Sequence, residues 1–298
     1  MPWPTFIICG MKKAATTSLY EYFQQHPDIY MSPIKETKYF IYDPDDSFFV
    51  DAPLSKYPIR TEQEYLALFD GVTHERAIGE ASPSYVISAR ARRQIASTLP
   101  DVKLIFSLRH PVDRFYSAYQ MGVRGGSIDL PFEEYVEKNQ DLLSQFEYCQ
   151  FLRPWIDEFD RSRLRFVLSE NLKRSPAGEL KKLYQFLGVD TSFSPLSLSQ
   201  HNSGGIPKNK SMQQVLFYFR KHPHKRKFAQ ILPQSARNMF HRLYASNLAA
   251  APAMSSTTRA YLSQRFAQDM EELATLIDVD LSIWFERDKT LSNSAQVS

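Results

Sequence analysis

The sequence predicts an α/β fold in which a central, mainly parallel sheet is flanked by helices in three layers. Three short runs of mostly apolar residues carry this prediction, at Thr5–Cys9, Lys103–Leu108 and Leu164–Ser169. Each run is rich in β-branched, leucine or aromatic residues and is bounded by charged or turn-forming residues, as buried strands are. Segments with helical spacing separate the runs. Strands that alternate with helices form βαβ units, and these units make parallel sheets.

The remaining elements of the first two thirds follow from the same patterns. Ala77–Glu80 is a further strand candidate, and residues 28–60 are rich in Pro, Asp, Tyr and Phe and are expected to be irregular. Asp113 is the expected N-cap of one helix, and Gly188 the expected end of another. The predicted helices are Ser18–Gln25, Glu62–Phe69, Ala89–Thr98, Asp113–Met121, Phe132–Asn139, Tyr148–Phe159 and Ala177–Leu187.

The last third of the chain has a different pattern. Residues 191–210 are rich in Ser, Pro, Gly and Asn and predict a loop, and Met212–Arg220, Phe228–Tyr244 and Thr257–Ile277 predict helices without strands. We therefore expect one domain over residues 1–298, with an α/β core at about 5–190 and a helical part at about 211–287.

Composition excludes several classes of protein. Of the 298 residues, 43% are hydrophobic and 13% are aromatic, which is ample for a packed core. The net charge of +3 does not predict a nucleic-acid-binding chain. Cys9 and Cys149 are too few for a disulfide scaffold, and the seven histidines show no metal spacing. With no apolar run long enough to span a membrane, we expect a soluble, cytoplasmic protein without a membrane or nucleic-acid partner and leave its oligomeric state open.

Residues Gly10–Leu19 form a basic, hydroxyl-rich turn between the first predicted strand and the first predicted helix. Backbone N–H groups at a helix N-terminus have no partner inside the helix, and the helix dipole attracts negative charge there. Lys12 and Lys13 add positive charge, and the hydroxyls of residues 16–18 add hydrogen-bond donors. The turn therefore predicts an anion-binding site; the alternative is a well-capped helix start with no ligand.

The same turn departs from the phosphate-binding pattern G-x-x-x-x-G-K-[ST]. Gly10 and Thr17 match the first glycine and the hydroxyl residue, whereas Ala15 and Thr16 replace the second glycine and the lysine. A kinase needs that lysine and Mg²⁺ to handle a triphosphate. Here the lysine lies inside the loop, at Lys13. A transferred sulfuryl group carries less negative charge than a phosphoryl group, so lysine and hydrogen bonds can handle it without a metal.

A second motif follows the strand at Lys103–Leu108. Arg109 comes at the carboxyl end of that strand, which is the edge where ligands bind in open α/β sheets. Ser117 follows one turn into the next predicted helix. An arginine fork and a hydroxyl suit a phosphate monoester; the alternative is an arginine paired with an acid and a serine without a ligand.

Both motifs resemble elements of one family. Gly10–Leu19 resembles the 5′-phosphosulfate loop of sulfotransferases, roughly G-x-x-K-[SGA]-G-T-[ST]-x-L, and Phe6–Phe40 is similar to bacterial and heparan-sulfate-type members. The run from Arg109 to Tyr119 resembles the family's 3′-phosphate element, R-[HN]-P-x-x-R-x-x-S-x-Y. The resemblance spans about residues 5–190. It implies a P-loop-like three-layer sandwich, with 3′-phosphoadenosine 5′-phosphosulfate (PAPS) as donor, 3′-phosphoadenosine 5′-phosphate (PAP) as product and no metal.

The resemblance also implies roles for particular residues. Lys13 is implied as catalytic, bridging the 5′-phosphate and the leaving oxygen, and a late loop that covers the nucleotide in the family points to Lys208. Ala15 departs from the family's usual glycine. If this position needs a positive φ, alanine is strained by about 1 kcal/mol or more. The implied donor-binding residues are Lys12, Lys13, Ala14, Ala15, Thr16, Thr17, Ser18, Arg109, Ser117 and Lys208.

Glu36 is the best candidate for the base that removes a proton from the acceptor. It aligns with a glutamate that precedes an aromatic pair in heparan-sulfate-type members; the alternative is a surface glutamate flanked by lysines. His110 is the second candidate, although it is expected to cap or pack. Gly79–Tyr85 resembles a family segment near the acceptor, often G-E-K-[ST]-P-x-Y, in which Ala81 replaces the lysine. The residues expected near the acceptor are Tyr39, Phe40, Tyr85 and His110, although the aromatics are equally compatible with a core role.

The leading hypothesis is an enzyme that moves a sulfuryl group from PAPS to a hydroxyl or amine of a small molecule, such as a natural product or a saccharide. Lys13 stabilises the leaving phosphate and Glu36 is the base. Two alternatives stay open. One is a nucleotide-dependent kinase, which the missing lysine at position 16 disfavours, and the other is an inactive nucleotide-binding module.

Overall fold

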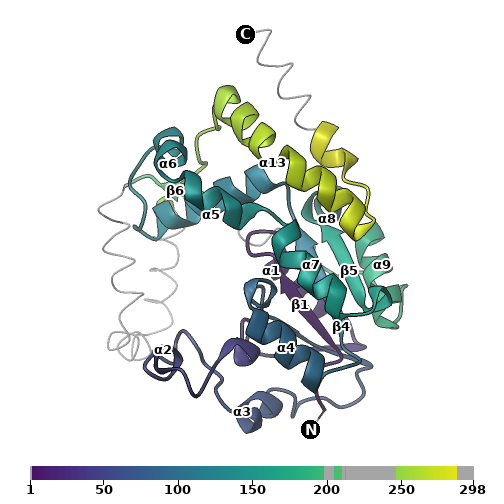
Figure 1. Ribbon diagram of the computed structural model, residues 1–298. Helices are drawn as coiled ribbons and strands as arrows, with labels where there is room; N and C mark the ends of the chain where they lie inside the picture. The colour runs from purple at the N-terminus through teal and green to yellow at the C-terminus, as the bar shows by residue number, and fades with distance from the viewer. Residues whose placement is uncertain (1, 198–204, 210–211, 213–245, 287–298) are drawn as a thin grey trace. The chain divides into compact units, whose positions relative to one another are not determined.

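The structure is a computed structural model that describes residues 2–197, 205–209, 212 and 246–286 (Figure 1). The described chain divides into two compact units. The first contains residues 2–110, 147–197 and 267–286, and the second contains the remaining described residues.

A five-stranded sheet forms the centre of the first unit. Its strand order is β2-β3-β1-β4-β5, and every pair of neighbouring strands is parallel. Figure 1 labels β1, β4 and β5 of this sheet together with helices of the same unit. The α/β class with a mainly parallel sheet is therefore confirmed. The strands are β1 (Phe6–Gly10), β2 (Ile29–Met31), β3 (Ala77–Ala81), β4 (Lys103–Leu108) and β5 (Leu164–Leu168).

Helices and short helical turns connect the strands of this sheet. Helices α1, α3, α4, α7 and α9 begin and end within two residues of the predicted bounds, and α4 coincides with them, whereas α2, α8 and the short helical turns were not predicted. The elements are α1 (Thr16–Phe23), η1 (Tyr39–Ile41), α2 (Ser47–Val50), α3 (Glu62–Ala67), η2 (Tyr85–Ile87), α4 (Ala89–Thr98), α7 (Cys149–Glu158), η4 (Arg161–Arg163), α8 (Ser169–Arg174) and α9 (Pro176–Leu187).

One face of the sheet packs against α1 and α9. Phe6 and Ile8 of β1 belong to the same buried cluster as Phe23 of α1 and Leu183 of α9. The rings of Phe6 and Phe23 meet edge to face with their centroids 5.5 Å apart, a geometry that aromatic pairs prefer. Burial of side chains of this size contributes roughly 1.5–3 kcal/mol each, so this cluster is a major anchor for α1 and for the loop that precedes it.

Helix α7 contributes to the packing of a second set of core residues. The Trp155 ring lies 5.6 Å from the ring of Phe106 in β4, and the Phe106 ring stacks on that of Phe166 in β5 at 5.5 Å. The indole N–H of Trp155 donates to the carbonyl of Val86 at 3.0 Å. This bond satisfies the one polar group of a buried tryptophan and ties η2 to α7.

The second unit contains mainly helices in its described part. Asp113 lies within α5, where its carboxylate pairs with Arg259 at 2.6 Å. The tyrosine hydroxyl of Tyr119 donates to the Leu130 carbonyl at 2.8 Å. The elements that include residues of this unit are α5 (Pro111–Arg124), α6 (Phe132–Lys138), η3 (Gln140–Phe146), β6 (Ile206–Pro207), β7 (Leu248–Ala249) and α13 (Ser256–Ile277), whose last residues belong to the first unit.

Several local predictions need correction. Asp113 is not an N-cap, because α5 begins at Pro111 and proline suits the first helical position. Strand β2 and helix α8 were not predicted, since a run of three residues or six residues leaves little periodic signal. The C-terminal ends predicted for α9 and α13 are confirmed, and Gly188 closes α9 with a φ of 79°.

Part of the last third lies outside the described residues. This part includes the helices predicted over Met212–Arg220 and Phe228–Tyr244, apart from Met212 itself, and most of the predicted loop after residue 197. The expectation of one domain therefore stays a prediction.

Gly79 should not tolerate a larger side chain. Gly79 lies opposite Phe6 in the β1–β3 register, and a Cβ atom at this position would stand 2.2 Å from the Phe6 ring. We expect Gly79→Ala to lower the free energy of unfolding by about 1–3 kcal/mol, the usual cost of overpacking a core, when measured by urea denaturation. Gly178→Ala on the exposed side of α9 is the control and should be neutral or stabilising. Equal stability of Gly79→Ala and wild type would contradict this packing.

Candidate active site

The predicted functional residues of the first unit gather at one edge of the sheet. Because all five strands are parallel, their carboxyl ends meet at the same edge, where ligands bind in open α/β sheets. The loop of residues 11–15 follows β1, the segment of residues 32–38 follows β2, and Arg109 follows β4. The topology therefore brings together motifs that are about 100 residues apart in the sequence.

The loop after β1 is attached to the end of β4 by three hydrogen bonds. The backbone N–H of Met11 donates to the Ser107 carbonyl at 2.5 Å, and the Ser107 hydroxyl donates to the carbonyl of Ala14. The Arg109 guanidinium donates to the carbonyl of Lys13 at 3.3 Å. The structure thus places Lys13 and Arg109, two predicted donor-binding residues from separate motifs, in direct contact.

Helix α1 begins where this loop ends, and its N-terminus is suited to an anion. No side chain caps the helix, and no acidic residue lies in its first turn. The first N–H groups of a helix have no intrahelical partner, and the helix dipole adds partial positive charge. Thr16, Thr17 and Ser18 provide hydroxyls at this end, while Lys12 is exposed and Lys13 is half-buried.

The backbone at this edge adopts left-handed conformations that non-glycine residues avoid. Among the described residues, positive φ angles occur at Lys13 (69°), Ala15 (64°), Glu36 (62°) and Lys38 (56°), and elsewhere only at Asp278 among the non-glycine residues. Such conformations cost about 1–2 kcal/mol each and cluster at functional sites. Their concentration in two segments marks this edge as the candidate site.

The conformation of Ala15 explains why the family usually has glycine at this position. With φ 64° and ψ 17° it is the left-handed residue that precedes α1, so the position does need a positive φ. The loop keeps this conformation with a methyl group, which packs against the buried cluster beneath α1. The strain expected from the sequence is therefore present and is partly offset by that packing.

Glu36 lies beside the end of β3. Its backbone N–H donates to the Ala81 carbonyl at 2.8 Å, and its carboxylate pairs with Lys35 at 3.5 Å, with the Glu36 side chain 34% exposed. The carboxylate is therefore accessible and is not a fully solvated surface group. Glu36 thus has the lysine neighbour expected of a surface glutamate and lies at the sheet edge expected of a site residue, and its role as the base stays a prediction.

Lys38 links this segment to the loop after β1. Burial lowers the pKa of Lys38, the charges of Lys12 and Lys56 lower it further, and the charge of Glu36 opposes them. Its ammonium donates to the Lys56 carbonyl at 3.2 Å. The charge of Lys38 is therefore affected both by Lys12 of the loop after β1 and by Glu36 of its own segment.

The end of β4 is held rigidly. The hydroxyl of Tyr148 donates to the carbonyl of Arg109 at 2.5 Å and accepts from its backbone N–H at 3.3 Å. The backbone N–H of His110 donates to Glu170 at 2.9 Å, and its buried ring lies 5.9 Å from that of Trp284. His110, the second candidate base, therefore packs inside the fold, which is the arrangement that we expected for it from the sequence.

Ser117 and Lys208 belong to the second unit. Ser117 is half-buried within α5, and the Lys208 ammonium donates to the Ser246 carbonyl at 2.9 Å next to the β6–β7 pair. Their roles as donor contacts stay predictions.

A buried carboxylate in β3 organises the wall next to Glu36. Glu80 is fully buried. Its Oε1 accepts from the hydroxyls of Tyr65 at 2.8 Å and Tyr85 at 3.0 Å. Its Oε2 accepts from those of Thr37 at 2.7 Å and Ser82 at 2.9 Å. We call these five residues the Glu80 network. Burial raises the pKa of Glu80, and the four hydroxyl donors oppose this shift.

The aromatic residues predicted to lie near the acceptor differ in burial. Phe40 and Tyr85 are 3% and 0% exposed, and the hydroxyl of Tyr85 is committed to the Glu80 network. Tyr39 is half-buried and stacks on Tyr65 with ring centroids 4.4 Å apart. Burial therefore favours the core alternative for Phe40 and Tyr85, while Tyr39 retains a surface that an acceptor can reach.

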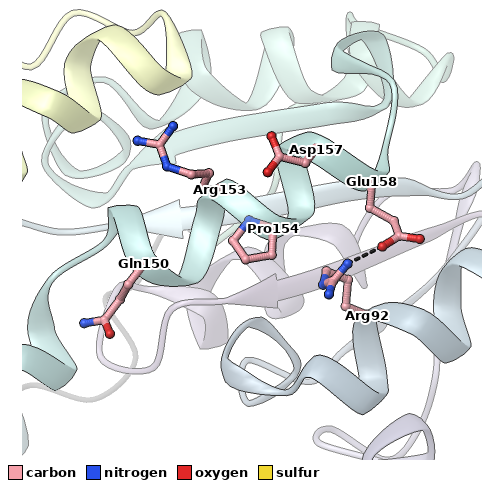
Figure 2. Close-up of a pocket in the computed structure, with 6 residues that line it drawn as sticks. All are labelled: Arg92, Gln150, Arg153, Pro154, Asp157 and Glu158. Atoms are coloured by element: carbon pink, nitrogen blue, oxygen red, sulfur yellow. Dashed lines mark hydrogen bonds and ion pairs between the residues drawn. The ribbon is translucent and has the colours of Figure 1, made fainter.

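A pocket of about 540 Å³ between α4 and α7 is separate from these residues (Figure 2). Three of its four charged lining residues form ion pairs, Arg92 with Glu158 and Arg153 with Glu272, which lies outside the pocket. None of the predicted site residues lines it. The lining residues are Arg92, Gln150, Arg153, Pro154, Asp157 and Glu158.

In the described part of the chain, no group of three or more His, Cys, Asp or Glu residues is placed to hold a metal ion. Within the same residues, no helix is both long and apolar enough to cross a membrane.

Comparison with known proteins assigns the family. Residues 4–249 match the family model of the sulfotransferase domain, a span that includes both motifs and the whole sheet. The chain belongs to the sulfotransferase family. This membership confirms the family and the transferase class predicted from the two motifs.

The relatives of this sulfotransferase chain are distant in sequence. The mouse (Mus musculus) protein heparan sulfate glucosamine 3-O-sulfotransferase 3A1 is 27% identical over 214 residues, covering 68% of this chain and 50% of the relative. The membrane-associated sulfotransferase kil1 of Dictyostelium discoideum is 29% identical over 146 residues, covering 47% of this chain and 29% of the relative. This chain spans about half the length of the mouse relative.

A solved structure supports the fold assignment. The crystal structure of a sulfotransferase from Alicyclobacillus acidocaldarius is 28% identical and has a TM-score of 0.66, covering 95% of this chain and 99% of that one. The likeness extends over nearly the full length of both chains and confirms the P-loop-like α/β fold.

The Glu80 network is the part of this sulfotransferase site that sequence reasoning missed. A signal was present, because Glu80 is the one charged residue in the buried strand AIGEA. A charge inside a buried strand must be compensated by hydrogen bonds or a counter-ion. The partners were not predictable, since Thr37 and Tyr65 come from segments 43 and 15 residues away.

Position 15 should accept glycine and resist β-branched residues. Ala15→Gly relieves the left-handed strain but loses the packed methyl group and adds freedom to the unfolded chain, so we expect its free energy of unfolding within about 1 kcal/mol of wild type. Ala15→Val should be less stable than wild type by about 1–2 kcal/mol, because β-branched residues are outliers at positive φ. Urea denaturation of the three proteins measures both effects. A valine variant as stable as wild type would mean that residue 15 is not left-handed.

Proposed function

We propose that this protein transfers a sulfuryl group from PAPS to a hydroxyl or amine of a small-molecule acceptor. The observation that carries the proposal is the contact between Lys13 and Arg109 beside the uncapped, acid-free start of α1. It joins two sulfotransferase motifs in one anion-binding edge. The cytoplasmic location expected from the sequence is part of the same proposal.

The residues of this edge fit a nucleotide that carries phosphate and phosphosulfate groups. Thr16, Thr17 and Ser18 offer N–H groups and hydroxyls as hydrogen-bond donors. The first turn of α1 contains no acidic residue that would repel an anion. Lys12 and Lys13 supply positive charge, and the arginine fork of Arg109 supplies directed donors. These are the groups that would hold the donor, and none of them requires a metal ion to do so.

Two residues carry the chemistry in this proposal. The acceptor oxygen or nitrogen forms a bond to sulfur while the bond from sulfur to the 5′-phosphate oxygen breaks. Glu36 takes the proton that the acceptor loses. Lys13 stabilises the charge that develops on the leaving phosphate oxygen. The rigid attachment of both segments to the sheet limits the reorganisation needed during reaction.

The acceptor class is the least constrained part of the proposal. Relatives are named for heparan sulfate glucosamine, but Ala81 stands where the family segment often has lysine, which removes one cation that would attract a sulfated or carboxylated polymer. We therefore propose a smaller acceptor, such as a natural product or a saccharide, that contacts the accessible ring of Tyr39.

Replacing Lys13 should abolish most of the transfer activity. With labelled PAPS and a panel of small hydroxyl and amine compounds, we expect the kcat of Lys13→Ala to be at least about 100-fold below wild type, the usual cost of losing a group that stabilises transition-state charge. The measurement is label transfer to the acceptor, and Lys181→Ala, on the exposed face of α9, is the matched control. Undiminished transfer by Lys13→Ala would remove its assigned role.

The same assay separates the competing functions. ATP turnover that requires Mg²⁺, with PAPS left intact, would identify a kinase. Binding of PAP by calorimetry without transfer to any acceptor would identify an inactive nucleotide-binding module. Transfer that continues in a chelator is expected from the proposed chemistry.

Replacing Glu36 should affect the chemical step more than donor binding. We expect Glu36→Gln to lower kcat by about 10²–10⁴-fold, the typical contribution of a general base, while the dissociation constant of PAP changes less than about threefold. Single-turnover transfer and calorimetry measure the two quantities. Glu64→Gln, at an exposed position in α3, is the control, and a Glu36→Gln variant with wild-type kcat would show that another group removes the proton.

A further inference from the structure

The buried carboxyl group of Glu80 is stabilised by hydroxyl groups. A carboxylate taken into the protein interior loses hydration worth several kcal/mol unless it is paired or fully hydrogen-bonded. Each oxygen of Glu80 accepts two hydroxyl bonds, at 2.7–3.0 Å, which fills the lone-pair positions of an ionised carboxylate. These distances are those of well-formed O–H···O hydrogen bonds, and a hydrogen bond to an ionised acceptor is stronger than one between neutral groups.

Two bonds of the network reach the segment that carries the predicted base. Thr37 lies between Glu36 and Lys38 in the sequence, and its hydroxyl donates to Glu80. The Ser82 hydroxyl also donates to Glu80 and accepts from the backbone N–H of Lys38 at 3.3 Å. Thr37 is thus held between two residues with positive φ angles, 62° at Glu36 and 56° at Lys38.

Such a backbone needs restraint from outside the segment. Two left-handed non-glycine residues within three positions are unfavourable by themselves and persist only where the surrounding structure holds them. The Thr37–Glu80 bond, the Ser82–Lys38 bond and the bond from the Glu36 N–H to the Ala81 carbonyl supply that restraint. All three partners lie in or directly after β3.

We propose that Glu80 is a positioning residue for sulfuryl transfer, which holds the Glu36 carboxylate at the sheet edge through the hydroxyl of Thr37. This inference rests on the proposed role of Glu36 as the base. Glu80 does not touch the reacting atoms. It fixes the backbone on each side of Thr37, so that the direction of the Glu36 side chain is set before the acceptor binds.

A matched pair of substitutions at Thr37 tests this role. Thr37→Val keeps the shape and removes the hydroxyl, whereas Thr37→Ser keeps the hydroxyl. We expect Thr37→Val and Glu80→Gln to lower kcat by about ten- to a hundredfold, with less than a threefold change in the dissociation constant of PAP. Thr37→Ser should restore kcat to within about threefold of wild type. Wild-type kcat in Thr37→Val would overturn the inference.

Two further variants separate positioning from a general structural role. Tyr30→Phe removes a hydroxyl bond of similar length, to the Leu68 carbonyl at 3.0 Å, outside the Glu80 network; its kcat should stay within about threefold of wild type. In a Glu36→Gln background, Glu80→Gln should cause little additional loss of kcat, because a residue that acts through Glu36 has nothing left to position. Equal kcat losses in Tyr30→Phe and Thr37→Val, or fully additive losses in the double variant, would overturn the inference.

Hydrogen exchange tests the positioning without relying on activity. We expect backbone amides of residues 36–40 to exchange at least about tenfold faster in Thr37→Val and Glu80→Gln than in wild type, and at the wild-type rate in Thr37→Ser. Amides of α9 serve as the internal control for global unfolding. If wild type transfers no sulfuryl group, the proposed function fails while the exchange result still decides the positioning role. Unchanged exchange in Thr37→Val would overturn the inference in an active or an inactive protein.

Discussion

The attachment of the loop after β1 to the end of β4 is the constraint on which the candidate site depends. Ser107 holds the loop by its carbonyl and its hydroxyl, and Arg109 holds the carbonyl of Lys13. These bonds fix the conformation in which Ala15 is left-handed and α1 begins without a cap. The proposed anion-binding edge therefore depends on strand register: β1 must lie beside β4 for Lys13 and Arg109 to meet.

The other half of the site depends on β3, the neighbour of β1 on its opposite side. Gly10 at the end of β1 lies against Val86, where a Cβ atom would be 2.9 Å from the valine side chain. This close approach brings the turn after β3 against the start of the loop. The Glu80 network then extends from β3 to the segment of Glu36. One central strand thus sets the spacing between the proposed donor-binding loop and the predicted base.

The sequence predicted the fold class and the two motifs because both depend on local patterns. Short buried strands, alternating helices and the residue types after β1 and β4 are visible without knowing any distant contact. What could not be predicted depends on contacts between distant segments. Strand β2 is only three residues long, the partners of Glu80 come from three separate segments, and the burial of Tyr85 follows from its bond to Glu80. The need for a positive φ at Ala15 could be stated as a condition, but only the backbone could decide it.

The distribution of charge explains why a chain with a net charge of +3 can still have a site for a polyanionic donor. Lys12, Lys13 and Arg109 converge on an edge where the first turn of α1 contains no acid. The two carboxylates nearby do not pair with the cations of this loop: Glu36 pairs with its own neighbour Lys35, and the four side chains that donate to Glu80 do so through hydroxyls. Stabilisation of Glu80 by hydroxyls in place of a lysine or arginine therefore takes no cation from the loop. The buried acid orders the wall of the site without forming an ion pair with the groups that an anionic donor requires.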